Sequence, residues 1–267
     1  MPDQQPLAEI FDAGAGDFER MAPSLWNPMG NALVAAADVK LDESVLDACC
    51  GGGSITVPAA QSAGPGAIVD AVDLSAELLE VASAKAETLS LENVVFTQSD
   101  VMGFRPGTEY DVVLCGYAVF FLPDMDAGVR HLASLLRSGG RLAFSTWAEG
   151  ALTEFSSALF RHCAAEGMEL PAASESSRDN MLRINTPPKV SAWLQELGLK
   201  DVNAVHTSVP VLLSKDLAWS LVMGSPLRQL LPADAAAAGR VRDAFLAELG
   251  EEYTLNADTL LVTAVKP

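Results

Sequence analysis

Short runs of apolar and β-branched residues alternate with segments of helical character through the middle of the chain. The apolar runs cover residues 45–48, 67–73, 94–97, 111–115 and 141–146. Segments with helical patterns lie between several of them, at 55–63, 75–89 and 126–137. Strands buried on both faces read as continuous apolar runs, and their alternation with helices is typical of a doubly wound, mostly parallel sheet. The pattern therefore predicts an α/β fold for residues 41–148.

The first apolar run leads into an acid and three consecutive glycines, in the sequence VLDACCGGGS of residues 45–54. Glycine permits positive φ and lets a ligand approach the backbone closely. We expect Ser54 to cap the following helix, with Pro58 in its first turn, where a missing N–H costs little. A strand, a glycine loop and a helix in this order commonly cradle a nucleotide-like cofactor. We expect this loop to do so; a tight turn without a ligand is the alternative.

Three acids stand at or just after the ends of three successive apolar runs. Asp47 lies at the end of the first run, Asp73 ends the second, and Asp100 follows the third. The carboxyl ends of parallel strands share one edge of a sheet, where open α/β sheets bind their ligands. Asp73 follows the last loop glycine by about 20 residues, a spacing that suits a carboxylate that accepts hydrogen bonds from a ribose diol. The acids therefore predict a site for a ribose-containing cofactor.

From residue 45 to residue 147 the chain resembles the class I S-adenosylmethionine-dependent methyltransferases. The resemblance is carried by VLDACCGGGS, VDAVDLSAELLEVA, FTQSDVM, YDVVLCGYAVFFLPD and LLRSGGRLAFSTW. It implies a doubly wound α/β fold with a seven-stranded, mostly parallel sheet and helical lid insertions. The last strand would be antiparallel and inserted beside the fifth. In general layout the chain is similar to small-molecule enzymes of quinone biosynthesis and specialised metabolism.

The resemblance also implies how the first loop would meet S-adenosylmethionine. Asp47 and the loop residues Cys49, Gly51 and Gly53 would border the methionine part of the cofactor. Cys115, at the end of the fourth strand, would face its amino-acid end. Cys49 departs from the family pattern, which has a glycine at this position. The departure bears on the affinity for the cofactor more than on the fold.

The later strand ends would hold the nucleoside part of the same cofactor. By the resemblance, Asp73 would bind the ribose hydroxyls and Leu74 would lie against the adenine. Asp100 would accept a hydrogen bond from the adenine amino group, and Val101 would offer its backbone N–H. Four residues from two neighbouring strand ends would thus surround the adenosine.

A nicotinamide dinucleotide is the competing cofactor for a glycine loop. Its fingerprint has glycines at the first, third and sixth positions, whereas the sixth position counted from Gly51 is Thr56. It also gives no role to Asp47 or Asp100. We therefore predict methyl transfer from S-adenosylmethionine to an O, N or C nucleophile of a small-molecule acceptor. The alternative function is a scaffold that binds the cofactor for a non-methylating cyclisation, a rearrangement or regulation.

A general base is needed only where the acceptor holds a proton at neutral pH. His162 is the candidate, because it borders the apolar face of a helix predicted over 152–167 and imidazole titrates near pH 6.5. A partly buried histidine bonded to a neighbour explains the same position without catalysis. Tyr117, after the fourth strand, is the alternative polar group, although a phenol is a poor base at neutral pH. We expect His131 to lie on the surface.

The segments on either side of residues 41–148 are expected to cover the site. Residues 1–40 would form an N-terminal flap of two short amphipathic helices separated at 14–16, a loop with Trp26, and a helix over 30–38. Residues 149–267 would hold lid helices and the C-terminal strands that complete the same domain. The elements expected there are helices at 152–167 and 189–197, a polar loop at 172–179, strands at 202–211 and 259–265, and a helical insert at 214–250.

Composition and charge narrow the partners. The formal net charge of the 267 residues is −18 at pH 7, which argues against nucleic acid because such a surface repels phosphate. The longest apolar stretch, 112–122, is too short to span a bilayer, and the first residues do not resemble a signal peptide. The four cysteines include no C-x-x-C pair. We expect a cytoplasmic enzyme with a small-molecule substrate and no metal, nucleic-acid or membrane partner; a homodimer is left open.

Overall fold

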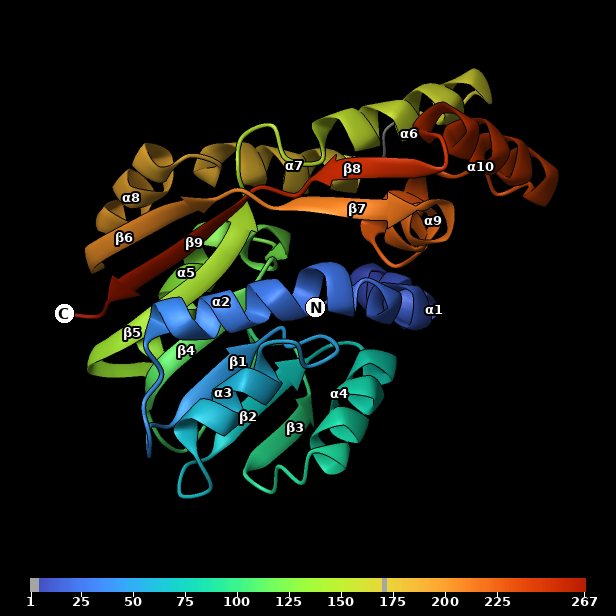
Figure 1. The fold of residues 1–267 in the computed structure, drawn as a ribbon. Helices are drawn as coiled ribbons and strands as arrows, with labels where there is room; N and C mark the ends of the chain where they lie inside the picture. The colour runs from blue at the N-terminus through green and yellow to red at the C-terminus, as the bar shows by residue number, and fades with distance from the viewer. Residues whose placement is uncertain (1–4, 170–171) are drawn as a thin grey trace.

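A seven-stranded sheet forms the centre of the molecule in a computed structural model that describes residues 5–169 and 172–267 (Figure 1). Its strands are β1 (Val45–Ala48), β2 (Val69–Asp73), β3 (Val94–Gln98), β4 (Tyr110–Gly116), β5 (Leu136–Trp147), β6 (Lys200–Thr207) and β9 (Thr259–Val265). They lie in the order β3-β2-β1-β4-β5-β9-β6. β9 is antiparallel to both neighbours, and the other pairs are parallel. The predicted sheet, with an antiparallel last strand beside the fifth, is confirmed.

Helices cover both faces of this sheet. α2 (Asn27–Ala37), α3 (Thr56–Ala63) and α4 (Ala76–Thr88) lie on one face, and α5 (Met125–Ser134) and α8 (Pro187–Glu196) lie on the other. Along β4, Val112 and Leu114 belong to the core under α2, whereas Val113 and Cys115 belong to the core under α5. All four are fully buried, which explains why the strand is continuously apolar.

Of the helices described, none has the length and apolar character needed to cross a bilayer.

A smaller lobe stands beyond the carboxyl ends of the parallel strands (Figure 1). It contains the antiparallel pair β7 (Pro210–Ser214) and β8 (Glu252–Asn256), with α6 (Thr153–Ala165), α9 (Lys215–Met223), the turn η3 (Pro226–Leu230) and α10 (Ala235–Leu249). Phe155 and Leu159 of α6 and Phe245 of α10 are fully buried in its core. α7 (Ala172–Ile184) contacts α8 and the short turn η2 (Val119–Phe121). The helical insertions expected in this part of the chain are present.

The N-terminal helix joins the sheet to the smaller lobe. α1 (Gln5–Arg20) and the π-helical turn η1 (Ala22–Trp26) run between the two, and α1 contacts both α4 and α9 (Figure 1). A Cβ atom added to Gly14 would lie 2.5 Å from the carbonyl oxygen of Met223, and one added to Gly224 would lie 2.3 Å from the backbone nitrogen of Phe18. α1 and α9 therefore approach more closely than side chains at these positions would allow.

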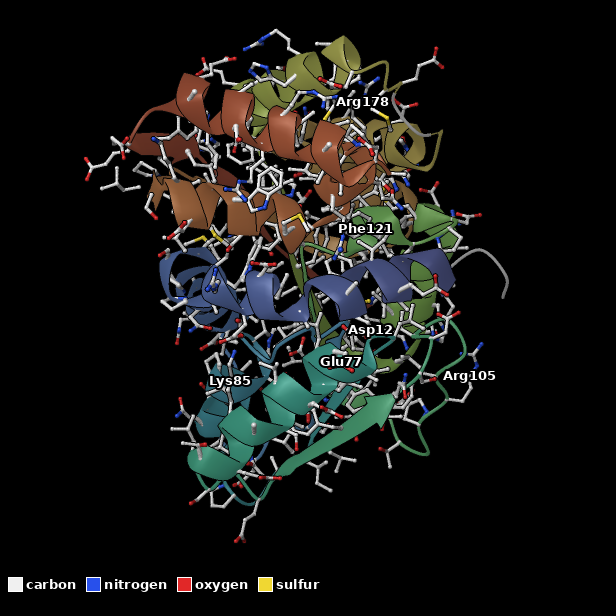
Figure 2. The ribbon with its side chains drawn as sticks, turned by 90° about the vertical axis from the view of Figure 1, so that its right-hand side faces the viewer. Asp12, Glu77, Lys85, Arg105, Phe121 and Arg178 are labelled. Atoms are coloured by element: carbon white, nitrogen blue, oxygen red, sulfur yellow. The ribbon has the colours of Figure 1, made fainter. Side chains whose placement is uncertain are left out.

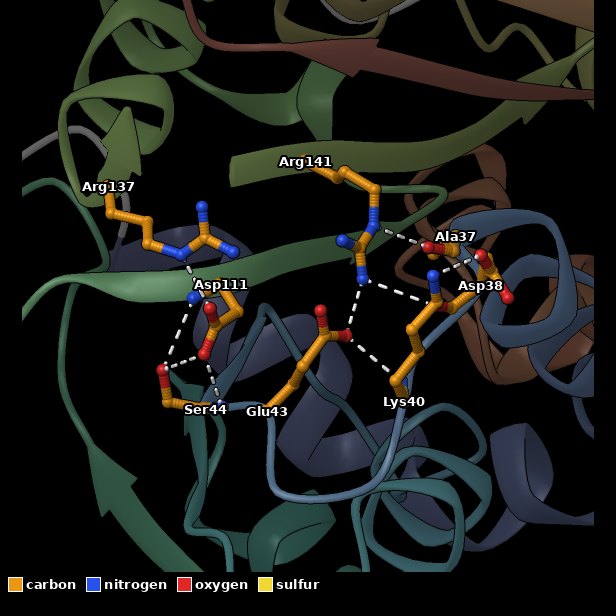
Figure 3. Close-up of polar contacts among 8 residues, drawn as sticks. All are labelled: Ala37, Asp38, Lys40, Glu43, Ser44, Asp111, Arg137 and Arg141. Carbon is orange, nitrogen blue, oxygen red and sulfur yellow. Dashed lines mark hydrogen bonds and ion pairs between the residues drawn. The ribbon is translucent and has the colours of Figure 1, made fainter. Parts of the chain in front are cut away.

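At the amino ends of the strands, charged groups tie α2 to the sheet (Figure 3). Nε of Arg141, on β5, donates to the carbonyl oxygen of Ala37 at 2.8 Å, and the same guanidinium pairs with Glu43. Asp111, on β4, pairs with Arg137 at 2.6 Å. Each of these two carboxylates thus has an arginine partner within the chain. The groups that bear on function lie at the opposite edge of the sheet.

The structure corrects three expectations about helices. Residues 5–20 form one continuous helix instead of two, because Gly14 packs against α9 rather than ending a helix. Trp26 ends a π-helical turn rather than lying on a loop. Residues 172–179, expected to be a polar loop, belong to α7.

Two further expectations fail in detail. The strand predicted over 202–211 is in fact two strands, because β6 pairs with β9 whereas β7 pairs with β8. The sequence pattern did not predict β8. The chain turns between them where Asp258 accepts the backbone N–H of Val209 at 2.8 Å. Ser54 does not cap α3; its hydroxyl donates to Oδ1 of Asn27 at 2.8 Å, and Ile55 precedes the helix without a side-chain cap.

Candidate active site at the carboxyl edge of the sheet

The glycine loop between β1 and α3 has an unusual backbone. Gly51 and Gly53 have φ of 52° and 81°, and Cys49 has φ of 58°. Residues other than glycine adopt this left-handed region at a cost of roughly 1–2 kcal/mol. Cys49 therefore keeps the backbone conformation that a glycine adopts more easily. A Cβ atom added to Gly53 would lie 3.0 Å from that of Ala82 on α4, so the loop also packs tightly against the next helix.

Asp73, at the end of β2, fixes this loop to the start of α4. Its Oδ2 accepts the backbone N–H of Gly51 at 2.8 Å, and its Oδ1 accepts the backbone N–H of Ser75 at 2.8 Å. Burial raises the pKa of this carboxyl above its usual range. Each carboxylate oxygen can accept a second hydrogen bond, so Asp73 retains acceptor capacity toward a ligand over the loop.

Asp47, at β1, is fully buried and only half satisfied. The hydroxyl of Thr56 donates to its Oδ2 at 2.6 Å, whereas its Oδ1 has no hydrogen-bond partner within the described part of the chain. Burial raises the pKa of Asp47 to about 7. A buried acceptor without a partner costs free energy, on the order of 1–3 kcal/mol. A ligand that brings a positively charged donor beside the loop would remove that cost, and the amino group of S-adenosylmethionine fits this requirement.

Cys49 and Cys115 bring the loop and the end of β4 together. Cys115 is fully buried, and β4 pairs with β1 in a register that places Leu114 beside Asp47. A hydrogen bond to Cys115, together with burial, raises the pKa of the Cys49 thiol well above its ordinary value. The side chain of Cys49 therefore meets the site as a neutral thiol at neutral pH.

The predicted adenosine contacts lie on the neighbouring strand ends. β2 and β3 are paired, and the backbone N–H of Ser99 donates to the carbonyl oxygen of Asp73 at 2.9 Å. Oδ1 of Asp100 accepts the N–H of Met102 at 2.9 Å. Leu74, which follows Asp73, is partly exposed. The structure thus brings Leu74 and Asp100 to the strand ends beside Asp73.

Val101 has a partner that the sequence did not predict. Its side chain is 4% exposed, and Nε2 of His131, on α5, lies 2.9 Å from its carbonyl oxygen. We expected His131 on the surface; it is only partly exposed, because α5 packs its side chain against the turn after β3. This contact fixes the turn that carries Val101.

Tyr117 stands immediately after β4 in a strained backbone conformation. Its φ is 51°, which is a genuine outlier for an aromatic residue. Its hydroxyl lies 2.6 Å from Oγ1 of Thr259, and its backbone N–H donates to the carbonyl oxygen of Ser145 at 3.1 Å. Burial raises the pKa of this phenol above its usual range. The hydroxyl is therefore protonated at neutral pH.

His162 lies in a different environment. Its Nε2 is 2.7 Å from Oε2 of Glu248 on α10, and Arg161 pairs with the same carboxylate. Phe155 and Leu159 of the same helix are buried in the core of the smaller lobe. Across the described residues, no hydrogen bond or ion pair joins His162 to Tyr117 or to the glycine loop. The structure therefore does not bring the two catalytic candidates together, and the role of His162 stays a prediction.

Sequence analysis missed the contacts that hold α1 over the site. Asp12 accepts the hydroxyl of Ser75 at 2.6 Å and the N–H of Glu77 at 3.2 Å (Figure 2). Nζ of Lys85 donates to Glu19 at 2.6 Å and to the carbonyl oxygen of Gly52 at 2.7 Å. The contacts of Asp12 and Glu19 join positions more than 60 residues apart, so no local pattern could have revealed them.

Comparisons with known proteins agree with this arrangement. Residues 45–140 match a family model described as "Methyltransferase domain". The chain is 30% identical over 145 residues to aklanonic acid methyltransferase DauC of Streptomyces sp. (strain C5), covering 54% of this chain and 66% of that protein. It is 29% identical over 146 residues to demethylmenaquinone methyltransferase of Lactococcus lactis, covering 52% and 58%. The matches thus span between about half and two thirds of these relatives.

A solved structure extends the likeness of fold to most of the chain. The YcgJ protein from Bacillus subtilis superposes with a TM-score of 0.58 at 21% identity, covering 89% of this chain and 98% of that one. At this level of identity the likeness concerns the fold alone. It reaches beyond residues 45–140 into the segments that build the smaller lobe.

Proposed function

We propose that this chain, which belongs to the class I S-adenosylmethionine-dependent methyltransferase family, transfers a methyl group to a small-molecule acceptor. The observation that carries the proposal is the carboxyl edge itself. A loop with left-handed backbone at Cys49, Gly51 and Gly53 is bonded to Asp73, beside the buried, half-satisfied carboxylate of Asp47. The two named relatives are methyltransferases of small molecules, which supports the same class of acceptor here.

The residues present fit S-adenosylmethionine, which supplies an activated methyl group on a positively charged sulfur when it is bound. We propose that Asp73 binds the ribose hydroxyls and that Oδ1 of Asp47 accepts from the amino group. Leu74, Asp100 and Val101 would surround the adenine. The remaining loop residues, with Cys115, would border the methionine part.

The protein's own contribution to such a reaction is placement and exclusion of water. Alignment of two reactants can contribute roughly 7–11 kcal/mol to the lowering of a barrier. α1 is bonded to the start of α4 through Asp12, and its Glu19 pairs with Lys85 of α4, which also donates to the loop carbonyl of Gly52. The smaller lobe stands over the strand ends. Tyr117 keeps its proton, so its hydroxyl cannot deprotonate an acceptor. With S-adenosylmethionine bound, the acceptor would exchange its proton for the methyl group, and S-adenosylhomocysteine and the released proton would be the other products.

Methyl-deuterated S-adenosylmethionine tests this proposal. The purified chain is incubated with the labelled cofactor and a set of phenols, amines and enolisable ketones, and both products are followed by mass spectrometry. We expect S-adenosylhomocysteine to accumulate together with a deuteromethylated acceptor. A converted acceptor that carries no label, with the cofactor recovered intact, would instead establish the non-methylating alternative.

A further inference from the structure

Four aromatic side chains form a continuous row next to the glycine loop. We call Phe18, Trp26, Tyr117 and Trp147 the aromatic row. The rings of Phe18 and Trp26 are stacked at 5.0 Å between centroids, and those of Tyr117 and Trp147 lie 4.4 Å apart. The Trp26 ring meets Tyr117 and Trp147 edge-on, at 5.7 Å and 6.2 Å. The four rings therefore form one stacked pair and one tilted pair, joined through Trp26.

The row begins at the proposed cofactor site and ends at the smaller lobe. A Cβ atom added to Gly51 would lie 3.7 Å from the Phe18 ring. Tyr117 and Trp147 come from the ends of β4 and β5, which are paired side by side. Both rings pack against the core of the sheet and against the core of the smaller lobe. This is where an acceptor must lie if its nucleophile is to reach a group bound over the glycine loop.

The rings of the row keep accessible surface, while their polar atoms are already bonded. All four residues are partly exposed, whereas large core side chains nearby, such as Phe120 and Phe144, are almost completely buried. Nε1 of Trp26 donates to the carbonyl oxygen of Phe18 at 3.0 Å. The hydroxyl of Tyr117 is bonded to Thr259. What the row offers to a ligand is therefore ring surface rather than hydrogen bonds.

Charged side chains take no part in the row. Among the interactions of residues 5–169 and 172–267, none joins a lysine, arginine, histidine or acidic side chain to any of these four rings. A charged acceptor would therefore leave water without gaining an opposite charge, which is costly. A planar aromatic acceptor, by contrast, gains buried area and offset or edge contacts worth about 0.5–1.5 kcal/mol per ring pair beyond the area term.

We propose that the aromatic row binds the methyl acceptor and that this acceptor is an uncharged, planar compound of fused aromatic rings with a phenol or enol group. The inference rests on the proposed function, since it names the substrate class of the same site. An organic cation is the competing ligand of aromatic clusters, because it is attracted to ring faces that converge on one point. In the described structure no acidic side chain contacts these four rings to offset the desolvation of a cation, so the row suits an uncharged aromatic ligand.

Isothermal titration calorimetry in the presence of S-adenosylhomocysteine tests the inference. The probes are 1-naphthol, its saturated analogue decahydro-1-naphthol, and choline. We expect 1-naphthol to bind at least tenfold more tightly than the saturated alcohol and choline not to bind. Equal binding of the two alcohols, or preferential binding of choline, would overturn the inference. This comparison uses the unaltered protein and does not depend on how any variant folds.

Variants of Trp147 test whether the binding of 1-naphthol depends on the aromatic row. Trp147→Leu should weaken 1-naphthol binding about tenfold or more, and Trp147→Phe should restore most of it. Trp219→Leu is the matched control, because Trp219 is also a partly exposed tryptophan but lies on α9 outside the row, and it should change nothing. Unchanged binding in a folded Trp147→Leu variant would refute the assignment. If S-adenosylhomocysteine itself fails to bind, the proposed function fails; if it binds and the probes do not discriminate, only this inference fails.

Discussion

The glycine loop and the aromatic row lie side by side at the same edge of the sheet but have opposite chemistry. The loop is surrounded by carboxylates and backbone N–H groups, with Asp47 and Asp73 both buried enough to raise their pKa. The row consists of ring surface without a charged partner in the described structure. The two meet where Phe18 approaches Gly51. Under the two proposals, the loop would bind the charged, polar cofactor and the row would bind the flat, uncharged acceptor.

The two regions also differ in how the chain builds them. The loop and its carboxylates come from one stretch, residues 45–101, in which each acid lies within a strand or just after it. The row collects its rings from α1, η1 and the ends of β4 and β5. Substitutions in the row can therefore change the acceptor without altering the cofactor site, and changes in the loop should leave ring binding intact.

Replacement of Asp73 should have the largest effect on cofactor binding by the glycine loop. Hydrogen bonds from two ribose hydroxyls to a carboxylate are worth roughly 1.5–3 kcal/mol each, so we expect Asp73→Ala to lower the affinity for S-adenosylhomocysteine at least 100-fold. The variant also leaves the N–H groups of Gly51 and Ser75 without their acceptor, which should lower the Tm. The measurement is the Tm rise produced by S-adenosylhomocysteine, which should nearly vanish. A rise like that of the unaltered protein would exclude Asp73 as the ribose ligand.

The raised pKa of Asp47 predicts that the free energy of unfolding depends on pH through this residue of the loop region. Burial raises the pKa of Asp47 from 3.8 to about 7. Between pH 4 and pH 7, Asp47 is therefore protonated in the folded state but ionised in the unfolded state. Without ligand, Asp47 therefore removes stability as the pH rises from 4 to 7, on the order of 4 kcal/mol in total. The difference in free energy of unfolding between the unaltered protein and Asp47→Asn measures it.

The affinity for the cofactor should also depend on the ionisation of Asp47, but it should increase with pH, whereas the stability of the ligand-free protein should decrease. The ionised carboxylate is the form that attracts an amino group, so the affinity for S-adenosylhomocysteine should fall as the pH drops below 7. In Asp47→Asn this pH dependence should be lost. Identical pH profiles for the two proteins, in stability and in affinity, would show that Asp47 does not titrate in this range.

Cys49 offers a smaller test of the loop backbone. Cys49→Gly should relieve the left-handed strain at φ 58°, whereas Cys49→Ala keeps that strain and loses the same contact with Cys115. After allowance for the greater freedom of glycine in the unfolded chain, we expect the glycine variant to be the more stable by about 1 kcal/mol. Chemical denaturation of the two variants measures the difference. Equal stability would mean that the backbone at position 49 is not strained.

The smallest effect is expected at His162, which lies outside both regions. Because its ring is held by Glu248 on α10, we expect His162→Ala to leave turnover within about threefold of the unaltered protein. Tyr117→Phe, inside the aromatic row, is the comparison variant. A loss of more than about 100-fold in His162→Ala, with a normal Tm, would support histidine as the general base.

The sequence predicted the loop side far better than the rest of the molecule. The strands from β1 to β4, and the three acids near their ends, are local features, since each residue's role follows from its place after an apolar run. The sheet and the position of β9 beside β5 are confirmed, and residues 45–140 match a methyltransferase domain, as the resemblance implied. The site roles of the acids themselves remain predictions.

Long-range packing explains what the sequence could not predict. Gly14 looks like a helix terminator until α9 packs against it, and β7 looks continuous with β6 until β8 pairs with it. The aromatic row is likewise invisible in the sequence, because Phe18, Trp26, Tyr117 and Trp147 have no common spacing. Only the fold places these rings in one row beside the loop.

The central claim is that the glycine loop and its acids form a site for S-adenosylmethionine rather than for a dinucleotide. Isothermal titration of the purified chain with S-adenosylhomocysteine, and separately with NADH, tests it most directly. The account predicts saturable binding of one molecule of S-adenosylhomocysteine per chain and no binding of NADH. Binding of NADH in the absence of any binding of S-adenosylhomocysteine would contradict it.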